Sequence, residues 1–320
     1  MLKDLSSLRA TDMKMYEIVN LDESLIPSVA SLVNSVYVHD SVSTWSLTRA
    51  TFLDPNFDPA LSLVAVEDGV PLGVAIGAVR NKEPKELITK EHAWMKVFAV
   101  RDEHLETGLG DRLLSQLEGE LRGRGYKDVR ATDFAGWHLF PGINIRSEKV
   151  LSFLAKKDYE KVSEAVDYLV DLSGFETPEM VLNLQDKFTQ AGFTFRIPDA
   201  VEKERVMSWA LDIFGPVWSY EIVMSFRHKP PGVIIAEQDE EIVGFAGFGA
   251  LELEWFGPLG VVEDPKYEGL STVLLYKALW EMKLRGQRTA VIPWASHLFF
   301  YSQLPNINKI KHYWILSKKL

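Results

Sequence analysis

Two stretches of the sequence have the same pattern, WMKVFAV at 94–100 and WFGPLGV at 255–261. Eight residues after the last valine of each stretch, a glycine begins a longer one: GLGDRLLSQLEGEL from Gly108 and GLSTVLLYKALWEM from Gly269. Apolar residues in both longer stretches recur at helical spacing, with Lys277 as a polar exception. Each pattern predicts a strand, a loop that ends in glycine, and an amphipathic helix.

The repeat continues on both sides of these stretches. Upstream, DGVPLGVAIG at 68–77 and DEEIVGFAGF at 239–248 both place a turn before an apolar run, and each follows another apolar run, which is a β-hairpin pattern. Downstream, DVRAT near Val129 and TAVIPW near Val291 predict a strand after each helix. The order strand, strand, strand, loop, helix, strand, helix, strand therefore occurs twice, which indicates a doubled architecture.

The doubled pattern divides the chain into two domains. We predict an α+β fold with two tandem domains, each a mixed β-sheet flanked by helices, over residues 14–175 and 180–320. The stretch SGFETPEM between them has linker composition, and VLNLQDKFTQ after it is typical of a connecting helix. A length of 320 residues agrees with two domains of about 150 residues each.

The composition excludes several classes of function. A net charge of -10 disfavours nucleic acid as a partner, because duplex binding needs a positively charged surface. No apolar run approaches the ~20 residues of a membrane span, and the N-terminal stretch MLKDLSSLRATDM lacks the apolar region of a signal peptide. The absence of cysteine excludes disulfides and thiolate sites, and the seven histidines show no metal-ligand spacing. We expect a cytoplasmic protein without a metal ion.

A strand, a short glycine loop and a helix can together hold a pyrophosphate. Glycine lets the backbone approach the ligand closely, and the helix N-terminus supplies unpaired N–H groups and a positive partial charge. Asp111, at the start of the first helix, would repel a phosphate. The two candidate loops are Leu105-Glu106-Thr107-Gly108-Leu109-Gly110 and Lys266-Tyr267-Glu268-Gly269-Leu270-Ser271.

Both halves resemble the GCN5-related N-acetyltransferase (GNAT) superfamily. Its signature, Arg/Gln-x-x-Gly-x-Gly/Ala, lies between the fourth strand and the next helix, where both loops lie, and the resemblance covers nearly the whole chain from Met15. The first loop has Leu105 where a hydrogen-bonding residue is usual, and the second replaces the last glycine with Ser271. The resemblance implies acetyl-CoA as co-substrate, bound once or twice per chain, and a primary amine of a small molecule or peptide as acceptor.

The resemblance also implies roles for particular residues. Backbone N–H groups of the fourth strand would stabilise an oxyanion, and these belong to Phe98 and Val100 in the first half and to Leu259 and Val261 in the second. Tyr301 lies where the family has a tyrosine that protonates the leaving thiolate. The first half has Phe153 and Leu154 there, without a hydroxyl. We therefore expect catalysis in the C-terminal domain and a supporting N-terminal domain.

A candidate base precedes the second of the two fourth strands. If the strand begins within LELEWF at 251–256, Glu252 and Glu254 lie on one face of it. Such a pair could bind the positive charge of the acceptor amine and take its proton through water, with one pKa raised by the neighbouring like charge. The alternatives are a solvated strand edge for the two glutamates and an ordinary half-buried aromatic for Tyr301.

Two other functions stay open at this stage. The first is a non-catalytic module in which two degenerate folds bind coenzyme A or a partner protein. The second is a tRNA-dependent aminoacyl transferase, a class that also uses paired domains of this fold. The CoA-type loops and the net charge of -10 disfavour the second.

Overall fold

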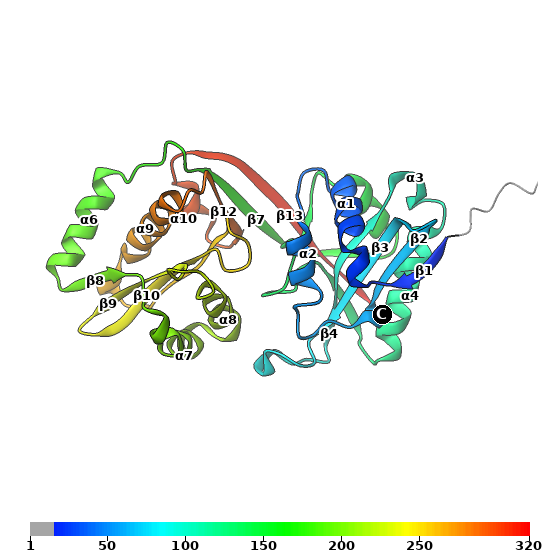
Figure 1. The fold of residues 1–320 in the computed structure, drawn as a ribbon, viewed down its shortest axis with the longest axis horizontal. Coiled ribbons are helices and arrows are strands. Elements are labelled where there is room, and N and C mark those ends of the chain that lie inside the picture. The colour runs from blue at the N-terminus through cyan, green and yellow to red at the C-terminus, as the bar shows by residue number, and fades with distance from the viewer. Residues whose placement is uncertain (1–15) are drawn as a thin grey trace, which may run out of the picture.

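A computed structural model describes residues 16–320 as two lobes (Figure 1). The predicted domain start at residue 14 and the N-terminal stretch MLKDLSSLRATDM lie outside the described residues. One sheet has nine strands, with eight in the order β1-β2-β3-β4-β5-β13-β7-β12 and β6 beside β13, and a second sheet has the order β11-β10-β9-β8. The predicted fold class is confirmed, because helices flank mixed sheets in an α+β fold of the GNAT type.

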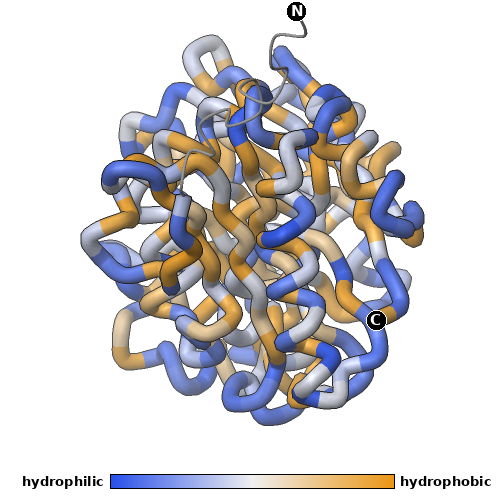
Figure 2. The backbone as a smooth tube through the Cα atoms, turned by 90° about the vertical axis from the view of Figure 1, so that its right-hand side faces the viewer, coloured by the Kyte–Doolittle hydropathy of each residue, from blue (hydrophilic) through white to orange (hydrophobic). Residues whose placement is uncertain are grey.

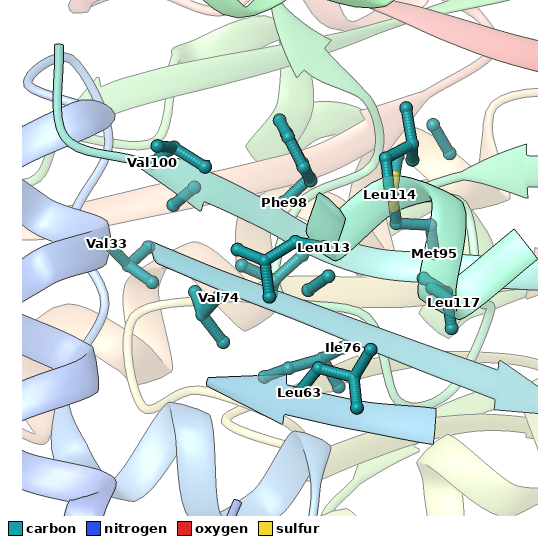
Figure 3. Packing of buried hydrophobic residues seen from close by; sticks show 14 of the residues in the cluster. Val33, Leu63, Val74, Ile76, Met95, Phe98, Val100, Leu113, Leu114 and Leu117 are labelled. Carbon is teal, nitrogen blue, oxygen red and sulfur yellow. The ribbon is translucent and has the colours of Figure 1, made fainter. Parts of the chain in front are cut away.

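The N-terminal lobe follows the predicted order of elements. The leucines of its central helix, Leu113, Leu114 and Leu117, lie against the strands (Figure 3). Its strands are β1 (Glu17–Asn20), β2 (Ser62–Glu67), β3 (Val70–Val79), β4 (His92–Val100), β5 (Asp128–Ala131) and β6 (Ile143–Asn144), and its helices are α1 (Ile26–Val36), α2 (Thr44–Ala50), α3 (Asp102–Leu105), α4 (Leu109–Gly123) and α5 (Glu148–Ala155).

The C-terminal lobe repeats this order after the connecting helix. The helices predicted from Gly108 and Gly269 are confirmed as α4 and α9. The strands of this lobe are β8 (Phe193–Arg196), β9 (Val233–Gln238), β10 (Glu241–Phe248), β11 (Phe256–Val261) and β12 (Thr289–Ala295), and its helices are α6 (Glu179–Gln190), α7 (Lys203–Phe214), α8 (Pro216–Ser225), α9 (Leu270–Leu284) and α10 (Leu298–Ser302).

Equivalent glycines show that the two lobes pack in the same way. Gly73 of β3 lies beneath α4, where an added Cβ would be 2.8 Å from Leu113 Cδ1. Gly244 of β10 lies beneath α9, where an added Cβ would be 3.0 Å from Leu274 Cδ1. At both positions an added Cβ would also lie 3.1 Å from a valine Cγ2, of Val100 or of Val261, so a side chain would crowd the same pair of neighbours in each lobe.

Two long strands join the lobes (Figure 1). β7 (Glu160–Asp171) and β13 (Ile307–Lys319) pair antiparallel along most of their length. The last residues of β13 also pair with β5 of the N-terminal lobe, and the last residues of β7 pair with β12 of the C-terminal lobe. Each lobe therefore completes its sheet with a strand from the other half of the sequence. The predicted boundary at 175–180 falls between β7 and α6 and stays a prediction.

The core of the N-terminal lobe is apolar, and of its buried cations Arg49, Arg80 and Lys96, one lies within a strand. Hydrophobic stretches of the backbone run through the middle of the lobe, and many outer loops are hydrophilic (Figure 2). Lys96, in the middle of β4, is the exception: its Nζ donates to Asp54 Oδ2 at 2.7 Å and to the Ala50 carbonyl. Burial lowers the pKa of Lys96 to about 8, while the nearby Asp54 carboxylate opposes this shift.

Candidate active site

The two sheets of the molecule separate between β11 and β12. A single parallel bridge, Trp255 to Val291, joins the two strands before they diverge. Past this bridge, residues 256–259 and 292–295 form opposite walls of a cavity of about 490 Å³. That volume is in the usual range for a small-molecule site.

The strand β11 turns backbone N–H groups toward this opening. Val262 donates its N–H to the Val243 carbonyl of β10 at 2.9 Å. Because the backbone groups of a strand alternate in direction, Leu259 and Val261 direct their N–H groups away from β10, to the side where β12 has diverged. The structure thus places both predicted oxyanion donors on the open edge of β11.

Tyr301 of α10 forms part of the wall of the same cavity. Its ring is half-buried and lies edge-on to Phe300 at 4.9 Å and to Phe256 at 6.5 Å between centroids. Burial raises the pKa of Tyr301 to about 12. The phenol is therefore protonated at neutral pH and can donate a proton or a hydrogen bond inside the cavity.

The carboxylate of this cavity belongs to Glu221, which sequence analysis did not single out. Helix α8 turns Val217, Trp218 and Glu221 toward the cavity, at a spacing that places the first and last on one helical face. Burial raises the pKa of Glu221 to about 7, against the opposing effect of the Arg49 charge. A carboxylate with such a pKa can accept a proton near neutral pH.

The predicted carboxylate pair of Glu252 and Glu254 is wrong. Residues 249–254 form bends and a turn, and β11 begins only at Phe256, so strand alternation does not apply to them. Glu252 instead pairs with Arg49 of α2, with 3.1 Å between Oε1 and the guanidinium nitrogen. Glu254 is exposed and lines a different cavity. Glu252 thus connects the two lobes, and neither glutamate lines the cavity that holds Tyr301.

The second glycine loop leads into α9 as the sequence predicts. Gly269 precedes the helix with φ of +89°, a conformation that favours glycine. Within residues 16–320, the N–H groups of Gly269, Leu270 and Ser271 have no backbone acceptor, and the first turn of α9 has no acidic residue. These N–H groups suit an anion, but Leu184 of α6 packs against Gly269, 2.9 Å from where a Cβ would lie, so an anion bound here would have to displace that side chain. The loop consists of the predicted residues Lys266, Tyr267, Glu268, Gly269, Leu270 and Ser271.

Side chains fill the corresponding opening of the N-terminal lobe. The N–H of Arg101 donates to the Leu72 carbonyl, so alternation directs the backbone groups of Phe98 and Val100 away from β3. The Tyr37 hydroxyl donates to the Phe98 carbonyl at 2.7 Å. Phe153 of α5 stacks on the Phe98 ring with 5.3 Å between centroids. The protein's own aromatic residues thus occupy the space next to β4.

The first glycine loop has the wrong charge for phosphate. A cavity beside Glu106 and Thr107 is also lined by the carboxylates of Asp102, Glu103 and Glu148, and carboxylates repel phosphate groups. Three lysines attach α5 and the turn after it to the loop, in the ion pairs Lys149–Asp102, Lys156–Glu106 and Lys157–Asp111. The predicted residues Phe98 and Val100 thus lie beside a slot that Tyr37 and Phe153 fill, and the predicted loop residues Glu106, Thr107, Gly108, Leu109 and Gly110 lie beside or next to this separate, acid-lined cavity.

Residues 30–140 match the sequence model of the acetyltransferase (GNAT) family. The match falls on the N-terminal lobe, whose slot beside β4 is filled, and the open cavity lies mainly in the C-terminal lobe, with Ala135 and His138 of the matched segment in its wall. No curated protein sequence matches this chain.

Several solved structures have the same fold as this chain. A GCN5-related glucosamine N-acetyltransferase region of a fungal multi-domain β-N-acetylglucosaminidase has a TM-score of 0.74 at 15% identity, over 95% of this chain and 38% of that chain. A GCN5-related N-acetyltransferase from Sphaerobacter thermophilus has a TM-score of 0.68 at 17% identity, over 95% of both chains. A tandem GNAT protein from the clavulanic acid biosynthesis pathway has a TM-score of 0.61 at 13% identity, over 95% of this chain and 98% of that chain.

Neither a metal site nor a membrane-spanning helix is present in the described part of the chain. Among residues 16–320, no group of three histidine or acidic side chains is arranged to hold a metal ion. No helix in this part of the chain has the length and apolar character needed to cross a membrane.

Proposed function

We propose that this chain is an acetyl-CoA-dependent N-acetyltransferase with one active site, in the C-terminal lobe between β11 and β12. One observation carries the proposal: a single cavity is bounded by the open edge of β11, the phenol of Tyr301 and the carboxylate of Glu221. We also propose a cytoplasmic location, for which the sequence is the sole support.

The C-terminal lobe has the groups that acetyl-CoA needs. Unpaired N–H groups at the start of α9 would hold its diphosphate, with Gly269, Leu270 and Ser271 as donors. The open edge of β11 would pair with the amide groups of its pantetheine arm. Bound there, acetyl-CoA supplies the activated acetyl group that is transferred.

Three groups of the chain then have distinct tasks in the transfer. A bond forms between the amine nitrogen and the acetyl carbon, and the carbon–sulfur bond breaks. A nitrogen that enters as the ammonium ion loses two protons, one to Glu221 before the attack and one that balances the proton delivered to the sulfur. Glu221 accepts the proton from the acceptor amine, and Tyr301 donates a proton to the departing thiolate. The N–H groups of Leu259 and Val261 stabilise negative charge on the acetyl oxygen.

The N-terminal lobe has a supporting role in this proposal. Tyr37 and Phe153 occupy the place where a pantetheine arm would lie, and the first turn of α4 includes Asp111. At the same place in α9, three residues after the loop glycine, the chain has Thr272. This difference provides a matched pair of substitutions.

Calorimetric titration with acetyl-CoA tests the proposal, and we expect one site per chain. Thr272→Asp gives α9 the acid that α4 has, and we expect it to weaken acetyl-CoA binding by at least about 10-fold through repulsion. Its thermal stability should be maintained, because an acid in the first turn favours the helix. The matched variant Asp111→Thr should leave the stoichiometry at one.

Three contrary results would each overturn a different part of the proposed function. Two sites in the wild-type chain would mean that the N-terminal slot opens. No binding at all would overturn the assignment to acetyl-CoA. Binding of one equivalent without turnover of any amine would favour the non-catalytic module instead.

A further inference from the structure

The cavity between β11 and β12 also carries information on the acceptor. Building on the proposed function, we infer that the acceptor is a primary amine attached to an apolar, aromatic-sized body without an acidic group, and that both lobes form its pocket. The inference follows from the walls of the cavity, its charge, and the contribution of the N-terminal lobe.

Five tryptophan, phenylalanine and tyrosine side chains line the cavity. Trp218 comes from α8, Trp255 and Phe256 from the start of β11, and Trp294 from β12, and all four line the cavity together with Tyr301. Flat aromatic walls gain free energy by removing apolar surface from water. They also attract a cation that lies over a ring face. An ammonium group on an apolar body uses both properties.

The backbone of β12 is distorted where it presents Trp294. Trp294 has φ of +50°, which a bulky residue rarely adopts, and it lies at a register shift between β12 and β7. Its N–H donates to Asp167 Oδ1 of β7 at 2.8 Å. Such strained backbone persists where surrounding structure holds it, and it occurs often at ligand sites. The distortion therefore marks the position of Trp294 as one with a function in the pocket.

The N-terminal lobe contributes a buried histidine to this cavity. His138 is 4% exposed, lines the cavity, stacks on Trp255 at 5.3 Å and lies edge-on to Trp294 at 5.2 Å between centroids. Neither of its ring nitrogens has a hydrogen-bond partner within residues 16–320. Buried polar atoms are nearly always paired in folded proteins. Two unpaired nitrogens beside the cavity thus indicate a place where a ligand or a water binds.

The electrostatics of the cavity disfavour an acidic acceptor. Burial lowers the pKa of His138 to about 3, so the imidazole is neutral at physiological pH. None of the described residues that line the cavity is a lysine or an arginine, and one, Glu221, is a carboxylate. The nearby Arg49 is 1% exposed and does not line the cavity, and it pairs with Glu252 through Nε and Nη2, while its Nη1 has no partner among residues 16–320. An acceptor with its own carboxylate would therefore bury a negative charge beside Glu221 without a partner, which is costly.

Two amines that differ by one carboxylate test this inference directly. Phenethylamine and phenylalanine share the same ring and amine, and ethanolamine lacks the apolar body. We expect phenethylamine to bind the full chain with a Kd at least about 10-fold lower than either of the other two. Binding is measured by calorimetry and by quenching of tryptophan fluorescence, because three tryptophans line the cavity. Acetylation is measured separately as release of free thiol from acetyl-CoA.

Two variants test whether the preference among the amines arises in this cavity. Glu221→Gln removes the negative charge and should reduce the preference for phenethylamine over phenylalanine by at least about 3-fold in Kd. His138→Phe should change the affinity for phenethylamine by at least about 3-fold, although His138 lies in the other lobe. For His138→Phe, an unchanged melting temperature shows that the lobes still pack.

The outcomes separate this inference from the proposed function. Equal binding of phenethylamine and phenylalanine, tighter binding of ethanolamine, or no binding of any of the three overturns the inference. Acetyl-CoA binding and turnover with other amines would then leave the proposed function intact. Selective binding of phenethylamine in a chain that does not bind acetyl-CoA would support the pocket and overturn the transferase.

Discussion

Glu221 makes the proposed chemistry depend on pH in a specific way. Its pKa is raised from its ordinary value to about 7, so the carboxyl is protonated below pH 7 and becomes a base above it. At pH 6 about 10% of the groups are ionised and at pH 8 about 90%, by the titration curve of a single group. For an acceptor that binds as the ammonium ion, we expect kcat/KM to rise about 10-fold between pH 6 and pH 8 and then to level off.

The assay is the initial rate of thiol release from acetyl-CoA at low phenethylamine concentration, measured from pH 5.5 to 9. In Glu221→Gln the amide cannot accept the proton, and we expect the rise to disappear and the plateau to fall by about 10²-fold. Glu221→Asp keeps a carboxylate one methylene further away, so it should keep the pH limb at a lower plateau.

A different profile would refute the role of Glu221. If the enzyme selects the small neutral fraction of the amine, kcat/KM will increase about 10-fold per pH unit and will continue to rise above pH 8. If Glu221→Gln shows the same profile as the wild type, Glu221 is not the base and the amine loses its proton to solvent before it binds.

Three further substitutions test the remaining assignments. Tyr301→Phe should lower kcat by about 10²-fold with acetyl-CoA affinity nearly unchanged, because the hydroxyl acts as charge develops on sulfur; an unchanged kcat removes the acid from the mechanism. Glu252→Gln leaves the buried Arg49 unpaired and should lower the free energy of unfolding by about 3 kcal/mol in urea, whereas Glu254→Gln, on the exposed turn, should change it by less than about 0.5 kcal/mol. Loss of turnover in folded Glu254→Gln would return the base to that residue.

The sequence predicts those parts of the fold that local patterns determine. The glycines before α4 and α9 and the leucine spacing within these helices depend only on neighbouring residues, so both helices are found where the sequence places them. Tyr301 is singled out because a short stretch, WASHLFFYSQL, resembles a family pattern; the structure places it in the wall of the cavity, and its role as the acid stays a prediction.

Sequence patterns do not predict the site residues whose positions depend on packing between distant segments. Glu221 and His138 line one cavity although they lie 83 positions apart in the sequence. No local pattern distinguishes Glu221 from other helical glutamates. The stretch LELEWF alternates like a strand, but its backbone turns at residues 249–254, and the guanidinium of Arg49 holds Glu252.

The exchange of β7 and β13 has a consequence for biosynthesis. Residues 316–319 of β13 lie beside β5, in the middle of the sheet that begins with β1. A ribosome that has released the first 175 residues has produced every helix of the N-terminal lobe, yet the place between β5 and β7 is still empty. That lobe can complete its sheet only after residues 307–319 have emerged. We therefore expect nascent chains cut short before β13 to expose two unpaired strand edges and to need chaperones or to aggregate.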